Sequence, residues 1–168
     1  VTSYIFEMSE DFLIEMGYAG LTGRLKRLSD AFMYQTRDFY REHDSEIEPN
    51  WHMIFLLLQK NETMTVTEIA DALQLSHPAI VKLINKMKKR GYINSNLDPE
   101  DNRRYNLVLS QKAKKELPVL EAYWEAGNKA LEEMLEHNTL LLEQLEQLEA
   151  RMAEADFKTR MDKLLINE

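Results

Sequence analysis

Residues 76–90 carry side chains whose types and spacing suit contacts to nucleic acid. The stretch reads SHPAIVKLINKMKKR, with apolar residues at spacings of three and four, which predicts an amphipathic helix. Its polar and basic face carries Ser76, His77, Pro78, Ala79, Val81, Lys82, Asn85, Lys86 and Lys89. Because an α-helix fits the major groove of DNA, we interpret this face as a recognition surface.

Each side-chain type on this helix suits one kind of contact. Asn85 suits a bidentate contact to adenine, and His77 suits donation to a base or a phosphate. The methyl groups of Ala79 and Val81 suit packing on thymine. The lysines supply attraction to phosphates, which holds register without choosing a sequence. A lysine-rich helix face is also what solvation alone produces, so this face does not decide the function by itself.

The elements on either side are those that would position such a helix. Thr65 or Thr67 can cap a short preceding helix, and Leu75 in the turn between the two helices is expected to be buried. Ser76 is the expected cap of the recognition helix, and Gly91 ends it where a left-handed residue is needed.

A hairpin with a basic tip follows this pair of helices. Residues 92–97 and 105–109 alternate as strands, and residues 98–102 make the turn between them. Asn102, Arg103 and Arg104 lie at the tip. Arg103 suits a narrow minor groove, where the negative potential is strongest, and Arg104 suits a backbone phosphate. Two helices, a tight turn and a basic hairpin together predict a winged helix-turn-helix.

Long amphipathic patterns flank this central segment. Helices are expected over residues 3–16 and from Leu21 to about His43, and the three glycines between them predict a break or a close approach of helices. Another helix begins at Gln111 after a Ser110 cap, with a kink at Pro118. The last helix is expected to run from Leu141 to Leu165 with a coiled-coil-like seam that needs a partner.

The expected fold class is mainly α with a small β-hairpin wing (α+β), a winged helix-turn-helix between flanking dimerisation helices. We assign residues 1–50 to N-terminal dimerisation helices, 51–110 to the DNA-binding domain and 111–168 to C-terminal dimerisation helices. The chain has a net charge of −8, but residues 51–110 carry +2 and each flank carries −5. The segment that would meet DNA is the only one of the three with a positive charge.

Several function classes have little support. The chain has no cysteine, which excludes disulfides and thiol catalysis and is compatible with the cytoplasm, where we expect the protein to act. Its longest apolar run is too short to span a bilayer, so no membrane partner is expected. The four histidines are dispersed without metal-ligand spacing. We therefore expect that the protein is not an enzyme and binds no cofactor or metal. A metal-sensing role for His43 or His137 is conceivable, although a lone histidine at a helix end is more often structural.

Residues 51–110 resemble the winged helix of the multiple-antibiotic-resistance regulator (MarR) family. The resemblance rests on TVTEIADALQLSHPAIVKLINKMKKRGYI followed by DPEDNRRYNLVLSQKA, including Asp-x-Arg at the wing tip, although Ala113 or no residue stands where the family often has glycine. It implies dimerisation through the terminal helices and a small-molecule effector bound between them and the winged domain. Phe39, Trp51, Phe55, Tyr123 and Trp124 would then line the effector pocket, although aromatic residues at helical spacing are more often core.

The sequence therefore predicts a sequence-specific regulator that binds double-stranded DNA as a homodimer. It would occupy a pseudo-palindromic site and act as a repressor by steric occlusion rather than as an activator. A small-molecule effector would release it from the DNA. The alternative is a helical dimeric adaptor whose winged domain does not bind DNA and contacts another protein instead.

Overall fold

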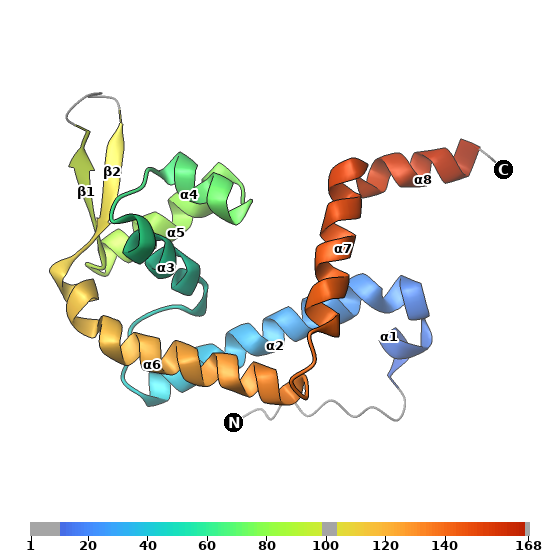
Figure 1. Ribbon diagram of the computed structural model, residues 1–168, viewed down its shortest axis with the longest axis horizontal. Coiled ribbons are helices and arrows are strands. Elements are labelled where there is room, and N and C mark those ends of the chain that lie inside the picture. The colour runs from blue at the N-terminus through green and yellow to red at the C-terminus, as the bar shows by residue number, and fades with distance from the viewer. Residues whose placement is uncertain (1–10, 99–103, 167–168) are drawn as a thin grey trace. The chain divides into compact units, whose positions relative to one another are not determined.

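The computed structural model describes residues 11–98 and 104–166 of the 168-residue chain. Its elements in order are α1 (Phe12–Glu15), η1 (Gly17–Gly20), α2 (Leu21–Glu42), η2 (Pro49–Trp51), α3 (His52–Asn61), α4 (Val66–Leu73), α5 (His77–Lys89), β1 (Ile93–Leu97), β2 (Tyr105–Leu109), α6 (Gln111–Met134), α7 (Leu140–Glu154) and α8 (Phe157–Ile166), where η marks a 3-10 turn (Figure 1). The predicted fold class, helices with one small antiparallel hairpin, is confirmed.

The chain divides into two compact units, Val1–Leu117 and Pro118–Glu168. The boundary falls at Pro118, inside α6, which continues as a helix through it. Proline has no N–H to donate to the preceding turn and crowds the carbonyl there, so this is the point of α6 with the weakest internal support. The first unit therefore contains the whole winged segment together with the first turns of α6.

The glycines near the N-terminus produce both of the expected features. Gly17 has a positive φ of 54° and ends α1, and a 3-10 turn then leads into α2. A Cβ on Gly20 would lie 1.9 Å from the carbonyl oxygen of Leu13, so the two segments approach too closely for any side chain there. Of the helix expected over residues 3–16, the first eight residues lie outside the described residues.

The winged segment is built around one apolar core. In the hairpin, Ile93 pairs with Leu109 and Leu97 pairs with Tyr105. Met64 adds a further bridge, because its N–H donates to the Leu107 carbonyl and its carbonyl accepts from the Leu107 N–H at 2.8 Å. The fully buried side chains of α3, α4, α5 and the hairpin include Ile54, Phe55, Ile69, Ile80, Ile84, Met87, Tyr92 and Leu107.

The C-terminal segment departs from the single long helix that the seam predicted. The chain leaves the helical conformation at Ala155, which has φ −157° and ψ 126°, so α7 and α8 are separate helices. The Asp156 carboxylate then accepts a hydrogen bond from the Thr159 N–H at 2.7 Å. Aspartate is more favourable at the N-cap of a helix than in a helix interior, which explains why α7 ends and α8 begins here.

The cap of α4 gives a prediction about stability. The Thr65 hydroxyl accepts from the Glu68 N–H at 3.2 Å, and the Glu68 carboxylate accepts from the Thr65 N–H at 2.7 Å, so the two residues cap each other. We expect Thr65→Ala to lower the free energy of unfolding by about 1 kcal/mol. Thr67→Ala, at an exposed position of the same helix, is the control. Equal urea midpoints for the two variants would contradict the role of the cap.

Candidate nucleic-acid interface

The recognition helix α5 has one buried face and one solvent-exposed face. Ile80, Ile84 and Met87 are buried, and they hold the helix against the rest of the winged segment. Of the nine residues expected to face DNA, Val81 is half-buried, and the exposed ones are Ser76, His77, Pro78, Ala79, Lys82, Asn85, Lys86 and Lys89. The structure thus brings these side chains to one accessible surface, while their contacts to DNA stay a prediction.

The N-terminal end of this helix keeps its polar groups available. Ser76 occupies the cap position with φ −64° and ψ 140°, yet its side chain makes no capping hydrogen bond. Pro78 lies in the first turn, where its missing N–H removes no helical bond. The Ser76 hydroxyl therefore makes no capping bond at a helix N-terminus, where the helix dipole favours an anion.

The turn before α5 differs from expectation at one residue. Gln74 ends α4 in the left-handed conformation at φ 51°, and the Leu75 N–H donates to the Ala70 carbonyl at 3.0 Å. The side chain of Leu75, which was expected to be buried, is 50% exposed. Because the turn is closed by backbone bonds, it holds without burying this side chain.

The lysines of α5 are available for an external partner. Lys82, Lys86 and Lys89 are exposed and Lys88 is half-buried. Within residues 11–98 and 104–166, none of these four ammonium groups forms an ion pair with a carboxylate. In that part of the chain, no carboxylate therefore neutralises the basic face.

The wing is described only in part. Asn102 and Arg103 lie outside the described residues, so their expected roles stay predictions. Arg104 begins the described part of the second arm, and its carbonyl accepts from the Asp98 N–H at 2.9 Å. Its guanidinium lies 3.4 Å from the Glu68 carboxylate of α4, so Arg104 has a protein partner that a phosphate would have to replace.

The aromatic residues expected to line an effector pocket have different environments. Trp51 and Phe55 are fully buried and pack against the ring of Tyr92, with ring centroids 5.7 and 5.8 Å apart. Phe39 is half-buried and stacks on the His43 ring at 4.1 Å. Tyr123 and Trp124 belong to the second unit, where Tyr123 is half-buried and Trp124 buried. The effector pocket stays a prediction.

The winged unit has an open groove at a different place. It measures about 620 Å³ and is lined by Leu58, Gln59, Glu62, Thr63, Val108, Leu109, Lys114 and Leu117. None of the five expected aromatic residues lines it. One lining residue, Glu62, has a positive φ of 59° and closes a tight turn in which the Thr63 N–H donates to the Asn61 carbonyl at 2.6 Å.

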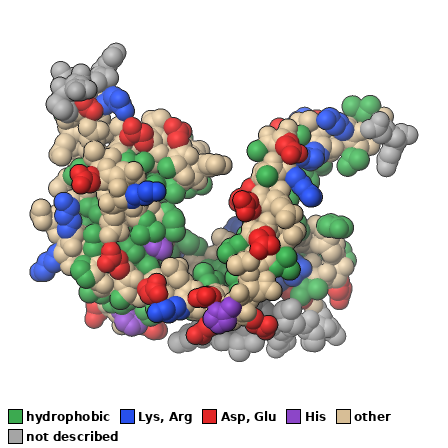
Figure 2. Space-filling view, in the orientation of Figure 1, with side chains coloured by type: hydrophobic (Ala, Val, Ile, Leu, Met, Phe, Trp, Pro, Cys, Tyr) green, Lys and Arg blue, Asp and Glu red, His purple; other side chains and the backbone are tan. Residues whose placement is uncertain are grey.

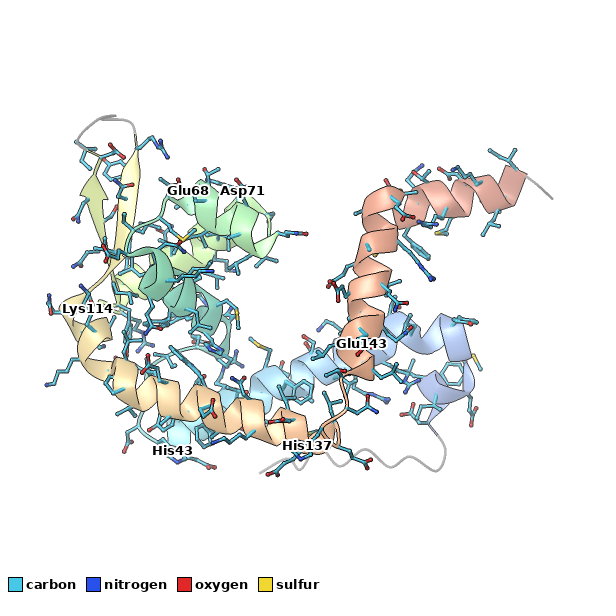
Figure 3. The ribbon with its side chains drawn as sticks, viewed as in Figure 1. His43, Glu68, Asp71, Lys114, His137 and Glu143 are labelled. Carbon is cyan, nitrogen blue, oxygen red and sulfur yellow. The ribbon has the colours of Figure 1, made fainter. Side chains whose placement is uncertain are left out.

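The histidines make local contacts. The Nδ1 atom of His43 lies 2.8 Å from the Phe39 carbonyl oxygen, and that of His137 lies 3.2 Å from the Glu132 carboxylate (Figure 3). Burial lowers the pKa of His52. Among the described residues, no three histidine, aspartate or glutamate side chains gather where they could hold a metal ion. No helix in that same part of the chain is long and apolar enough to cross a membrane.

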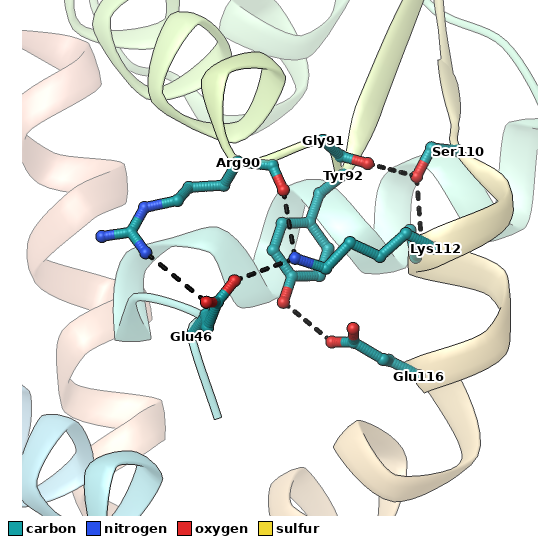
Figure 4. Close-up of polar contacts among 8 residues, drawn as sticks. Glu46, Arg90, Gly91, Tyr92, Ser110, Lys112 and Glu116 are labelled. Atoms are coloured by element: carbon teal, nitrogen blue, oxygen red, sulfur yellow. Dashed lines mark hydrogen bonds and ion pairs between the residues drawn. The ribbon is translucent and has the colours of Figure 1, made fainter. Parts of the chain in front are cut away.

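One group of contacting residues was not foreseen from the sequence. Glu46, Tyr92, Lys112 and Glu116 meet beside the end of α5 (Figure 4). The hydrogen bond between Lys112 and Glu46 joins residues 66 positions apart. No periodicity, cap or turn signal operates over such a separation, so only the folded chain could reveal this contact.

Two short helices with a tight turn, an exposed polar second helix and an antiparallel hairpin define a winged helix-turn-helix protein. Residues 45–104 match the family model described as MarR family. Over these residues the chain is similar to the MarR family, so the resemblance stated from the sequence is confirmed.

Solved structures show the same fold at low sequence identity. A MarR protein from Peptoclostridium difficile is 21% identical with a TM-score of 0.65, covering 94% of this chain and 99% of its own. The S. aureus MepR–DNA complex is 19% identical with a TM-score of 0.63, covering 80% and 96%. The transcriptional repressor CouR, bound to a 23-mer DNA duplex, is 23% identical with a TM-score of 0.63, covering 74% and 89%. Among curated proteins, none matches the chain.

The position of Glu68 between a helix cap and the wing gives a prediction about pH. Hydrogen bonds from Thr65, followed by the charge of Arg104, hold the pKa of Glu68 below its usual value of 4.5. A carboxyl group with a depressed pKa stabilises the fold fully above its unfolded pKa, and the effect is lost as pH falls through the folded pKa.

We therefore expect Glu68→Gln to lower the thermal midpoint at pH 7 and to have a shrinking effect as the pH falls below about 4.5. Asp71→Asn, at an exposed carboxylate on the same helix (Figure 3), is the control for loss of one negative charge. A Glu68→Gln effect that is equal at pH 7 and pH 3.5 would contradict the coupling.

Proposed function

We propose that this protein is a sequence-specific DNA-binding transcriptional regulator. The observation that carries the proposal is the exposed polar face of α5, opposite the buried Ile80, Ile84 and Met87. A helix with that geometry presents its N-terminal side chains to base edges in a major groove. Structures of similar fold, MepR and CouR, were solved with DNA, which supports the same partner here.

The contacts divide by the information that they carry. Asn85, His77 and the methyl groups beside them read base edges, whereas Lys82, Lys86 and Lys89 meet phosphates and hold register. Arg103 enters the minor groove beside this site. Arg104 reaches a phosphate by exchanging its exposed Glu68 partner, an exchange of small cost because exposed ion pairs contribute little to stability.

The small positive charge of one DNA-binding segment, residues 51–110, favours a homodimer. A net +2 over residues 51–110 gives weak attraction to a polyanion, and a second copy doubles the phosphate contacts. Exposed apolar side chains at Leu21, Leu25, Leu28 and Phe32 recur along α2 at spacings of four, three and four. That spacing is typical of a helix that packs on another helix, so α2 is proposed as part of the dimer contact.

The second unit offers further apolar surface for the same purpose. Figure 2 shows hydrophobic side chains on the surface of α7 and α8. The exposed apolar residues of these two helices include Leu141, Leu142, Leu148, Met152, Phe157, Met161, Leu164 and Leu165, and the last two are each 71% exposed. An apolar surface of this extent on so short a segment indicates a protein partner, and a second copy of the same chain is the partner proposed.

A dimer of this kind would bind a pseudo-palindromic operator in the cytoplasm and repress by blocking access to the promoter. A small molecule bound between the winged segment and the dimer helices would then release the DNA. Such regulation needs no catalytic group.

Substitutions on α5 test the proposed division of roles. We expect Asn85→Ala to weaken binding to a selected duplex by about 1–3 kcal/mol while leaving non-specific binding unchanged. Lys82→Ala should weaken both and reduce the slope of log affinity against log salt by about one. Lys60→Ala, an exposed lysine on α3, is the control for charge. Affinity that does not fall with salt would favour the adaptor function instead.

A charged substitution in α8 tests the dimer. We expect Leu164→Glu to give a monomer in sedimentation velocity, because a carboxylate would be buried at the proposed contact. Leu97→Glu, at an exposed apolar residue of the wing strand β1, should leave the dimer intact. The wild-type footprint should show two half-sites with centres roughly one helical turn apart. A single asymmetric half-site would rule out the symmetric arrangement.

A further inference from the structure

Lys112, in the first turn of α6, contacts the end of the recognition helix. Its ammonium Nζ donates to the Arg90 carbonyl oxygen at 3.2 Å and to the Glu46 carboxylate at 2.9 Å (Figure 4). The same group lies 4.2 Å from the centroid of the Tyr92 ring. Three different segments of the first unit, the residue after α5, the loop before α3 and the hairpin entry, therefore meet at one cation.

The position of this lysine is unfavourable for its own helix. A cation in the first turn of a helix opposes the helix dipole, and the carbonyls at the end of a helix lack intrahelical partners. Lys112 lies at the start of α6 but serves the end of α5, where Arg90 is the C-terminal cap residue. Its charge therefore stabilises the recognition helix and not the helix to which it belongs.

Glu46 completes the arrangement. Its carboxylate accepts from Lys112 and lies 4.0 Å from the Arg90 guanidinium, so it joins two cations. The hydrogen bond from Lys112 holds the pKa of Glu46 below its usual range, with a smaller contribution from Arg90. Glu46 stays charged at neutral pH and keeps both cations in place.

A second set of bonds runs beside the first. The Ser110 hydroxyl donates to the Gly91 carbonyl at 2.6 Å and accepts from the Ala113 N–H at 3.1 Å, capping α6 while it binds the turn after α5. The fully buried Tyr92 donates its hydroxyl hydrogen to Glu116 at 2.8 Å. Burial, and then Glu116, raise the pKa of Tyr92, so its phenol remains a donor.

We infer that Lys112 is a positioning residue that sets the orientation of the recognition helix relative to α6 without touching DNA. The inference rests on the proposed function, since orientation matters only if α5 reads a groove. α6 continues along the chain into the second unit, which carries part of the proposed dimer surface. The contact therefore joins the end of the recognition helix α5 to α6, the helix that continues into the second unit.

The competing explanation is that Lys112 contacts a DNA phosphate directly. The neighbouring Lys114 distinguishes this role from the positioning role. Lys114 is exposed, projects from the same turn of α6 (Figure 3) and forms no ion pair among the described residues. Lys112→Met and Lys114→Met remove the same charge two residues apart and keep a side chain of similar length. Only the first removes the bonds to Arg90 and Glu46.

The test compares these variants in the full-length protein on two duplexes at a temperature where both are folded. One duplex is selected by the wild-type protein from a random pool, and the other is a scrambled duplex of equal length. We expect Lys112→Met to bind the selected duplex roughly fivefold to tenfold more weakly, the effect of losing one typical intramolecular hydrogen bond. Its affinity for the scrambled duplex and its salt slope should equal those of Lys114→Met.

Lys112→Arg should restore selective binding, because a guanidinium can still donate to both oxygen partners. Equal effects of Lys112→Met and Lys114→Met on both duplexes would overturn the inference. A salt slope reduced by about one in Lys112→Met alone would also overturn it, because that marks a lost phosphate contact. If Lys112→Met does not fold, Glu46→Gln tests the same bond from an exposed position, and unchanged selectivity there counts against the inference.

Amide hydrogen exchange of the free protein separates this inference from the proposed function. The Tyr92 N–H donates to the Met87 carbonyl and the Ser110 N–H to the Tyr92 carbonyl, both at 2.9 Å. Both amides should exchange faster in Lys112→Met than in Lys114→Met. Equal exchange rates overturn the positioning role whether or not DNA binds. Faster exchange in a protein that selects no duplex would leave the contact in place and reject the proposed function.

Discussion

The burial of one apolar stripe on α5 is the constraint on which the rest of the winged unit depends. Ile80, Ile84 and Met87 face the core, and together they fix which side of the helix remains in solvent. Because the helix repeats every 3.6 residues, burying these positions forces Lys82, Asn85 and their neighbours outward. The hairpin and α4 then serve mainly to complete the core behind that helix.

Electrostatics in this protein depends on how charges are distributed and paired. The chain as a whole is acidic, and several carboxylates close to the winged segment are committed to structural contacts. Glu68 caps α4 and pairs with Arg104, and Glu46 joins Lys112 to Arg90. The lysines of α5 have no such partners among the described residues. Positive charge without an ion-pair partner in the described part of the chain thus lies on the face where a polyanion would bind.

The two ends of the recognition helix are treated differently by the fold. Its beginning is left open, since Ser76 makes no capping bond and the first turn is exposed. Its end is held by Lys112, Ser110 and the packing of Tyr92. A helix that must place its N-terminal side chains accurately benefits from a fixed far end, because a small tilt there is magnified along its length. The bonds at the end of α5 thus hold the helix in place, and the exposed residues at its start remain accessible to a partner.

The sequence by itself determined what depends on short-range patterns. Periodicity placed α2, α5 and the hairpin, and caps such as Thr65 and Ser110 act over three residues. The break between α7 and α8 was missed because the apolar spacing runs on through it, while Asp156 acts as a local cap. The aspartate signal was present in the sequence, but periodicity outweighed it.

Only the tertiary structure decided what depends on residues far apart along the chain. It showed Leu75 exposed and placed Trp51 and Phe55 on the ring of Tyr92. It also brought Glu46 to Lys112 across 66 positions. Periodicity in the sequence indicates which side of a helix or strand is apolar, but it does not indicate which other element covers that side. Packing among segments far apart in the sequence decides this, and the local sequence does not encode how those segments are arranged in space.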